Sequence, residues 1–158
     1  MNSLKLHAAA VALAFSLLPA CAPAAPPSSA NSKAEPGTAA NHREELAMLE
    51  KFLAEPDQEL ARKVASFVRD SPDVMVVVRQ GLVPAGDHEL LMVGFMAANA
   101  RAQLVAGKKQ DAPLEGVRGM LETYRRLQQQ DPKLRSSLLD ELAGLDESAL
   151  ERRVHEGA

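Results

Sequence analysis

Asp87, His88 and Glu89 stand together immediately before a long apolar stretch, and their side chains are of types that hold metals or move protons. The run His88-Glu89-Leu90-Leu91-Met92 approaches the zinc-protease pattern, which needs a second histidine four residues after the first. Met92 occupies that position, so the second imidazole ligand is missing. Consecutive residues at a helix start point in different directions, and we therefore expect these three side chains to cap a helix.

The other residues capable of catalysis are scattered along the chain. His42 and His155 lie far apart in sequence, and we expect both to be exposed at helix ends. Carboxylates such as Glu44 and Asp140 fall at helix starts or on polar faces, where a solvated role is typical. The sequence contains no nucleophile elbow, phosphate-binding loop or dinucleotide fingerprint. We therefore expect a protein that is not an enzyme and that uses no cofactor and no metal.

Four methionines and one polar pair suggest binding surfaces. The unbranched methionine side chain adapts its shape, so a group of them could line a groove for a partner helix. The residues in question are Met75, Met92, Met96 and Met120. Core filling is the favoured alternative for all four. Asn99 and Arg101 follow the most apolar run, where they could line a cleft, and an interhelical hydrogen bond or an emerging helix edge is the favoured interpretation.

Cys21 is the single cysteine of the sequence, and the residues before it have the pattern of a secretory leader. Lys5 supplies a positive charge, the uncharged run 8–18 supplies an apolar centre, and Ala20 is small. The apolar run is well short of the roughly 20 residues that cross a bilayer as a helix. A single cysteine cannot form an internal disulfide, which favours another use for its thiol.

The residues Leu18-Pro19-Ala20-Cys21 resemble the lipobox of bacterial lipoproteins. This resemblance concerns the leader alone and implies that residues 1–20 are a signal peptide and that Cys21 carries diacylglycerol and a further acyl chain such as palmitate. Two or three acyl chains hold a protein on a membrane durably. Ala22, in place of an aspartate, implies the periplasmic face of the outer membrane. The alternative is cleavage after Ala22 or Ala24, which would give a soluble periplasmic protein.

The composition changes twice along the chain, after the leader and again near residue 40. Residues 21–40 combine the cysteine with a stretch rich in Pro, Ala and Ser that lacks large apolar side chains, so we expect a disordered tether. Such a tether spans about 25 Å on average. Residues 41–158 have the size of one domain. The formal net charge of −3 argues against a nucleic-acid partner.

The domain reads as a succession of amphipathic helices, which predicts an all-α fold. We expect an irregular bundle or stacked helical hairpins of about six or seven helices. Their expected starts are Asn41 with Glu44 as a capping box, Pro56, Ser71-Pro72-Asp73, Asp87, Pro113, Asp131-Pro132 and Asp146. The helix from Asp87 to about Ala106 is apolar nearly all round and should be central. Its small residues Gly94, Ala97 and Ala98 should let neighbouring helices approach closely.

The run Val74–Val78 fits two assignments, because its β-branched residues also suit a buried strand. No second strand-like run is available to pair with it, and an isolated strand would leave backbone groups without hydrogen bonds. We therefore expect a helix that follows Asp73 and ends near Gly81.

These features favour a lipid-anchored helical protein of the cell envelope that binds another envelope protein, as an assembly factor, a pilotin-like escort or an accessory subunit. The first alternative is a periplasmic inhibitor or immunity protein, whose acidic balance would match a basic target. The second is a helical enzyme that acts on envelope lipid or glycan through scattered carboxylates and histidines.

Incorporation of labelled palmitate tests the expected anchor. We expect the full chain to become labelled in cells and a Cys21→Ala variant to lose the label, because the thiol is the attachment point. Equal labelling of the two proteins would refute acylation at Cys21.

Overall fold

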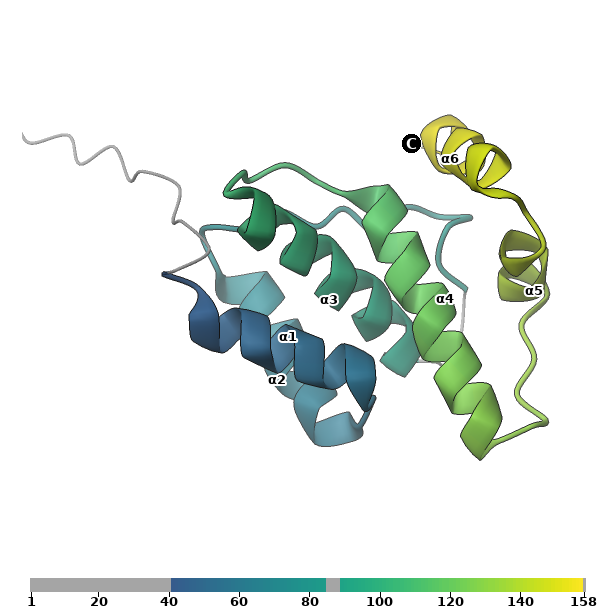
Figure 1. Cartoon of the computed structure of the whole chain (residues 1–158), viewed down its shortest axis with the longest axis horizontal. Coiled ribbons are helices and arrows are strands. Elements are labelled where there is room, and N and C mark those ends of the chain that lie inside the picture. Colours follow the sequence, from purple (N-terminus) through teal and green to yellow (C-terminus); the bar gives the residue numbers. More distant parts are fainter. Residues whose placement is uncertain (1–40, 85–88, 158) are drawn as a thin grey trace, which may run out of the picture. The chain divides into compact units, whose positions relative to one another are not determined.

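The computed structural model describes residues 41–84 and 89–157, which form six α-helices (Figure 1). In chain order these are α1 (Arg43–Ala54), α2 (Gln58–Asp70), α3 (Glu89–Ala106), α4 (Pro113–Gln130), α5 (Ser137–Ala143) and α6 (Glu147–Glu156). Beyond one isolated bridge between Gln80 and Val83, these residues contain no β-structure. The expected all-α class is confirmed. None of the six helices combines the length and the apolarity needed to cross a membrane.

Side-chain caps fix the starts of three helices, which are α2, α5 and α6. The Asp57 carboxylate accepts the N–H groups of Glu59 and Leu60 at 2.8 and 2.9 Å, and the Asp146 carboxylate accepts that of Ala149 at 2.8 Å. Each carboxylate pairs with N–H groups that lack a partner within the helix and lies near the positive end of the helix dipole. The expected start at Asp146 is confirmed, and the helix after Pro56 begins at Gln58.

Two expected helix starts are wrong. His42, not Asn41, precedes α1, and its side chain makes no capping hydrogen bond. Asp131-Pro132 forms a turn, in which Asp131 accepts the N–H groups of Lys133 and Leu134. The following helix, α5, begins only after Ser136, whose hydroxyl accepts the N–H of Leu139.

Tyr124 in α4 fixes the later start of α5. Its hydroxyl accepts the N–H of Ser136 and donates to the Asp140 carboxylate, both at 2.9 Å. Burial raises the pKa of the Tyr124 hydroxyl, and the neighbouring Asp140 carboxylate raises it further. The hydroxyl therefore keeps its proton at neutral pH and continues to donate to Asp140.

The expected helix after Ser71-Pro72-Asp73 is also wrong. Pro72 and Asp73 form a turn, with the Asp73 N–H donating to the Ser71 hydroxyl, and residues 74–79 then run without helical or sheet structure. We call residues 74–79 the extended segment. Side chains of other elements bond its backbone, so the lack of a partner strand does not exclude an extended conformation. Six of the seven expected helices are therefore present.

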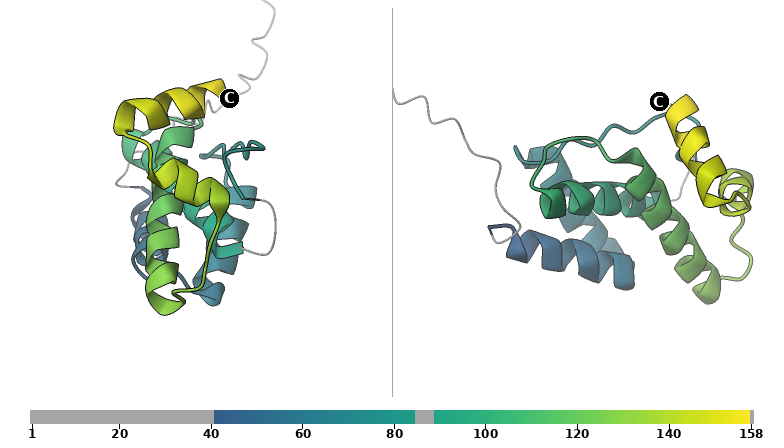
Figure 2. Two further views of the ribbon diagram at one scale, coloured as in Figure 1. Left: turned by 90° about the vertical axis from the view of Figure 1, so that its right-hand side faces the viewer. Right: turned by 45° about the horizontal axis from the view of Figure 1, so that its top comes forward.

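The buried apolar side chains form two clusters, and α3 contributes to both. Leu91 and Phe95 join the cluster made mainly with α4, α5 and α6, whereas Val93 and Ala97 join the one made with α1 and α2. Figures 1 and 2 show α3 between these two groups of helices. This arrangement confirms that α3 is the central helix and explains why it is apolar nearly all round.

Small residues set the close packing of α3 against α4. Gly94 faces Thr123, and a Cβ at Gly94 would lie 2.5 Å from the Thr123 hydroxyl oxygen. Gly119 faces Ala98, and a Cβ there would lie 3.0 Å from the Gly94 carbonyl oxygen and overlap the Ala98 methyl group. The expected close approach through Gly94 and Ala98 is confirmed, and it accounts for Gly119 within a helix despite its low helix propensity.

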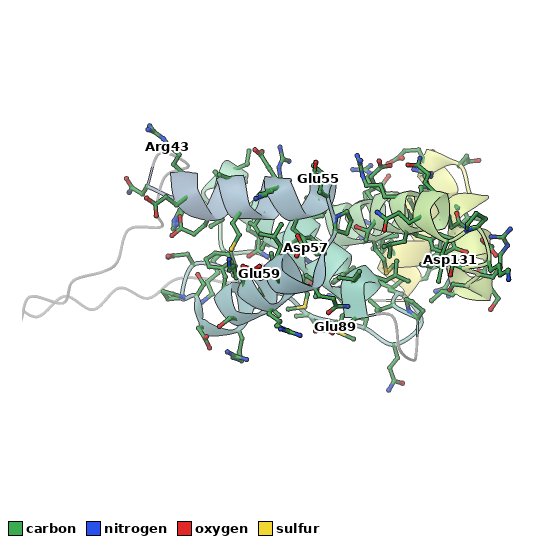
Figure 3. The ribbon with its side chains drawn as sticks, turned by 90° about the horizontal axis from the view of Figure 1, so that it is seen from below. Arg43, Glu55, Asp57, Glu59, Glu89 and Asp131 are labelled. Atoms are coloured by element: carbon green, nitrogen blue, oxygen red, sulfur yellow. The ribbon has the colours of Figure 1, made fainter. Side chains whose placement is uncertain are left out.

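Charged side chains lie mainly on the outer surface. Figure 3 shows Glu55, Asp57 and Glu59 around the junction of α1 and α2, and all three are exposed. Glu59 pairs with Lys63 at 2.7 Å, and this neighbour lowers the pKa of the Glu59 carboxyl. Exposed pairs of this kind contribute little to stability.

The substitution Gly119→Ala tests the helix contact. Overpacking costs about 1–3 kcal/mol, and the better helix propensity of alanine offsets about 1 kcal/mol of that loss. Because the added methyl group would overlap Ala98 and approach a backbone carbonyl, we expect the upper end of the overpacking range and so a net fall of about 2 kcal/mol in the free energy of unfolding, measured by urea denaturation.

Gly144→Ala is the matched control. The nearest atoms to a Cβ at Gly144 lie at 3.4 and 3.6 Å, which is ordinary contact, and the φ of −84° suits alanine. We expect a change within about 0.5 kcal/mol. Equal stability of the Gly119→Ala variant and the unaltered protein would contradict the close contact.

Candidate functional site

The most unusual feature of the domain is the attachment of the extended segment to α3 by a buried amide. The Gln103 side chain, 2% exposed, accepts the N–H of Met75 at 2.9 Å and donates to the carbonyl oxygen of the same residue at 2.8 Å. One glutamine side chain thus takes both hydrogen bonds that a neighbouring strand would supply. It also donates to Asn99 at 2.7 Å, so it is well satisfied despite its burial.

Asp111, in the connection between α3 and α4, holds the next part of the segment. One of its carboxylate oxygens accepts the N–H of Val77 at 3.2 Å and the amide of Asn99 at 2.8 Å. The other oxygen lies 3.0 Å from the guanidinium of Arg79. The carboxylate is largely shielded from solvent, and these partners compensate its burial.

Asn99 ties this network together. It is completely buried, and its carbonyl oxygen accepts from Gln103 and from the N–H of Ala112 at 3.0 Å. Asn99 is hydrogen-bonded, but the expected interhelical bond is wrong, because its partners belong to α3 itself and to the loop that follows it. Arg101 emerges at the surface and pairs with Glu50 of α1 at 3.0 Å.

Side chains of the extended segment alternate between the core and the solvent as far as Val77. Val74 is 4% exposed and Val76 packs against both apolar clusters, whereas Met75 and Val77 are 45% and 41% exposed. Val78, at 47%, also faces solvent. Alternation of this kind is the pattern of a strand. The segment therefore presents apolar side chains outward from a firmly attached backbone.

The extended segment and α3 together build one apolar surface. Met92, Met96, Asn99 and Gln103 are spaced by four, three and four residues, which places them on one face of α3. Gln103 binds the start of the segment, and Leu82 beyond its end packs with Leu91 and Phe95, so the segment runs antiparallel to α3. Met92, 40% exposed, extends the same side. We call Met75, Val77, Val78 and Met92 the methionine–valine surface.

The four methionines expected as possible partner contacts divide between surface and core. Met75 and Met92 belong to the methionine–valine surface, and Met96 lies half-buried on the same face of α3. Met120 is completely buried in the apolar cluster that α3 forms with α4, α5 and α6, so it is a core residue.

The histidine and carboxylate candidates that the structure describes do not form a shared site. Asp87 and His88 lie outside the described residues, and Glu89 is exposed at the first turn of α3. His155 is exposed, as expected, and lies 3.9 Å from Glu151 of its own helix. His42 is only 9% exposed, so the expectation that it is solvated is wrong.

His42 lines an open hollow of about 330 Å³ at the turn after α2. Its two ring nitrogens lie 4.0 Å from a Glu45 oxygen and 3.9 Å from an Asp73 oxygen, beyond hydrogen-bonding distance. Ser66 bonds Asp70, and Ser71 accepts the N–H of Asp73. Neither serine hydroxyl is hydrogen-bonded to the His42 imidazole. The hollow therefore lacks the contact between a nucleophile and its general base.

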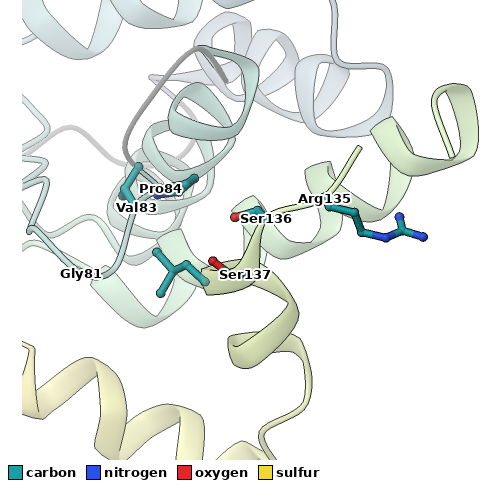
Figure 4. A pocket seen from close by; sticks show the side chains of 7 residues that line it. Gly81, Val83, Pro84, Arg135, Ser136 and Ser137 are labelled. Carbon is teal, nitrogen blue, oxygen red and sulfur yellow. The ribbon is translucent and has the colours of Figure 1, made fainter. Parts of the chain in front are cut away.

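A second open hollow, of about 440 Å³, lies between Pro84 and the start of α5. Figure 4 shows that the Arg135 side chain extends away from Val83 and Pro84. The Ser136 hydroxyl already caps α5. The polar groups of this hollow therefore do not converge on one point, as those of a ligand pocket usually do. Among the residues that the structure describes, no three His, Cys, Asp or Glu side chains are placed to hold a metal ion.

Comparisons of the chain with protein-family models, with curated proteins and with solved structures gave no match.

Gln103 and Asp111 were not anticipated from the sequence. The one local signal is the spacing of Asn99 and Gln103, four residues apart on a helix whose remaining residues are mostly apolar. Two side-chain amides on one buried face require hydrogen-bond partners. The backbone of a segment that has no partner strand can provide them.

The substitution Gln103→Leu tests the attachment of the extended segment. It keeps an apolar side chain in the buried position but leaves the N–H and carbonyl groups of Met75 without their partner. We expect a fall of about 1–3 kcal/mol in the free energy of unfolding. Hydrogen exchange at the amides of Met75 and Val77 should also accelerate more than exchange in α4.

Arg101→Gln is the control, because it removes an exposed pair from the same helix. We expect a change within about 0.5 kcal/mol and unaltered exchange at Met75. Unchanged protection of Met75 in the Gln103→Leu variant would show that the amide does not hold the segment.

Proposed function

We propose that this chain is a membrane-anchored helical lipoprotein that binds another protein of the bacterial cell envelope, as an assembly factor, escort or accessory subunit. Acyl chains on Cys21 hold it on the outer membrane facing the periplasm. The bound protein contacts the methionine–valine surface.

The observation that supports this proposal is the exposure of that surface. Its four side chains are each at least 40% exposed, and all come from the extended segment or from one face of α3. Met92 and Gln103, which binds Met75, mark its two ends on α3. At the rise of an α-helix, the surface is therefore about 16 Å long. Contiguous apolar patches on soluble domains commonly mark interaction sites.

The backbone beneath the surface is suited to binding. Gln103 and Asp111 hold the extended segment in place, so its backbone loses little conformational entropy when a partner binds. The two methionines keep flexible side chains that fit themselves to a partner. A fixed backbone with adaptable side chains favours recognition of a protein surface.

The substitution Met92→Glu tests the proposal. A carboxylate within an apolar contact would lose its hydration without gaining a partner, so binding should weaken strongly. We expect at least tenfold less of the partner to be recovered when the tagged full chain is cross-linked in membranes and purified. Recovery is measured by quantitative mass spectrometry.

Val105→Glu is the matched control. Val105 is 56% exposed on the same helix, but its position is about 140° from Met92 around the axis. Both variants should keep the free energy of unfolding within about 0.5 kcal/mol. A chain that recovers no specific protein, or equal loss with both variants, would contradict binding through the methionine–valine surface.

A further inference from the structure

Two side chains of the methionine–valine surface are open to chemical modification. Among the methionines that the structure describes, only Met75 and Met92 are exposed, at 45% and 40%. Met48 and Met96 are half-buried against the apolar clusters, and Met120 is completely buried. Oxidation of a methionine requires that the oxidant reach its sulfur atom. The fold therefore separates two accessible thioethers, both on the proposed binding surface, from three that are shielded.

The reaction of a thioether with a hydroperoxide transfers one oxygen atom. The sulfur attacks one peroxide oxygen, the O–O bond breaks, and the sulfur loses two electrons to the oxidant. The proton of the transferred oxygen passes to the leaving oxygen, which departs as water when the oxidant is hydrogen peroxide. The product is a polar, chiral sulfoxide, and two reductases, one for each epimer, convert it back to the thioether.

The fold depends little on the two exposed sulfur atoms. Met75 is held through its backbone, whose N–H and carbonyl groups both bond Gln103. Met92 lies between Leu91 and Val93, and these two neighbours supply the buried contacts of that turn of α3. Oxidation at both methionines therefore changes the polarity of the surface and leaves the core and the attachment of the extended segment intact.

The surface itself changes character when these sulfur atoms are oxidised. Met75 lies on the extended segment and Met92 on α3, so a sulfoxide enters the surface from each of the two elements that build it. A sulfoxide oxygen buried against an apolar partner loses its hydration without gaining a hydrogen bond. Burial of an unpaired polar group of this kind weakens a contact by about tenfold or more.

We propose that Met75 and Met92 form a reversible oxidation site, at which hydroperoxides weaken protein binding and sulfoxide reductases restore it. The effect on binding rests on the proposed function. The selective oxidation of these two residues, and its reversal in the folded domain, do not depend on a partner.

Peptide mapping by mass spectrometry tests the oxidation site. The full chain in membranes is treated with hydrogen peroxide for increasing times, and the sulfoxide at each methionine is quantified. We expect Met75 and Met92 to be oxidised at least about tenfold faster than Met120, whose sulfur is reached only when the core opens. In urea, which unfolds the domain, the three rates should become similar. Oxidation of Met75 or Met92 as slow as that of Met120 in the folded chain would overturn the site.

Reduction of the oxidised chain tests reversibility. We expect the two stereospecific reductases together to remove the oxygen from both residues without urea. The urea concentration at the midpoint of unfolding should be the same before and after oxidation of Met75 and Met92. A lower midpoint, or sulfoxides that are reduced only after unfolding, would show that oxidation damages the fold.

Cross-linking of the tagged full chain in membranes tests the effect on binding. We expect about tenfold less partner to be recovered after peroxide treatment, and the original amount after reduction. Unchanged recovery from a chain that carries sulfoxide at both Met75 and Met92 would overturn the regulation. If no chain recovers a specific protein, the proposed function and its regulation both fail, whereas the mapped rates still decide the oxidation site.

A chain with both Met75→Leu and Met92→Leu shows whether these two sulfur atoms are responsible. Leucine keeps an apolar side chain of similar volume, so the partner should still be recovered, and peroxide should no longer lower the recovery. Oxidation of the partner itself would lower recovery equally with this chain. The matched control, Met48→Leu with Met96→Leu, should keep the full response to peroxide. A response that persists in the Met75→Leu, Met92→Leu chain would overturn the proposal.

Discussion

The close contact between α3 and α4 is the constraint on which the other elements depend. Gly94 and Gly119 remove the side chains that would separate these helices, and Thr123 and Ala98 fill the remaining space. The close packing lets α3 serve as a wall for two apolar clusters, one on each side. Because α3 contributes side chains to both clusters, a shift of α3 away from α4 would displace residues of both.

A second consequence of the central position of α3 is that it must carry polar groups inside the molecule. Asn99 and Gln103 are almost completely buried, and each finds partners in a loop or an extended backbone and not in another helix. The domain thus includes a strand-like segment without a sheet. Its outward apolar side chains can remain exposed because the side chains of α3 and Asp111 fix the backbone.

Local sequence signals predicted most of the helices and failed where the deciding contacts were distant. Leu49 and Val64 lie on helix faces that their own periodicity reveals, and Asp146 caps the helix that immediately follows it. The extended segment instead depends on hydrogen bonds from residues 28 and 34 positions away, which no local pattern contains. The exposure of Met75 follows from those same distant contacts, whereas the burial of Met120 follows from the packing of α4 with its neighbouring helices.

The dependence of the extended segment on distant side chains also affects the order in which the chain acquires structure. Gln103 and Asp111 come after the segment in the sequence, so its backbone remains free until α3 and the following loop have formed. During that interval the run Val74–Val78 is a short, uncharged and strongly β-prone stretch, the type that initiates aggregation. Asp73 and Arg79 stand at the two ends of this run as charged gatekeepers.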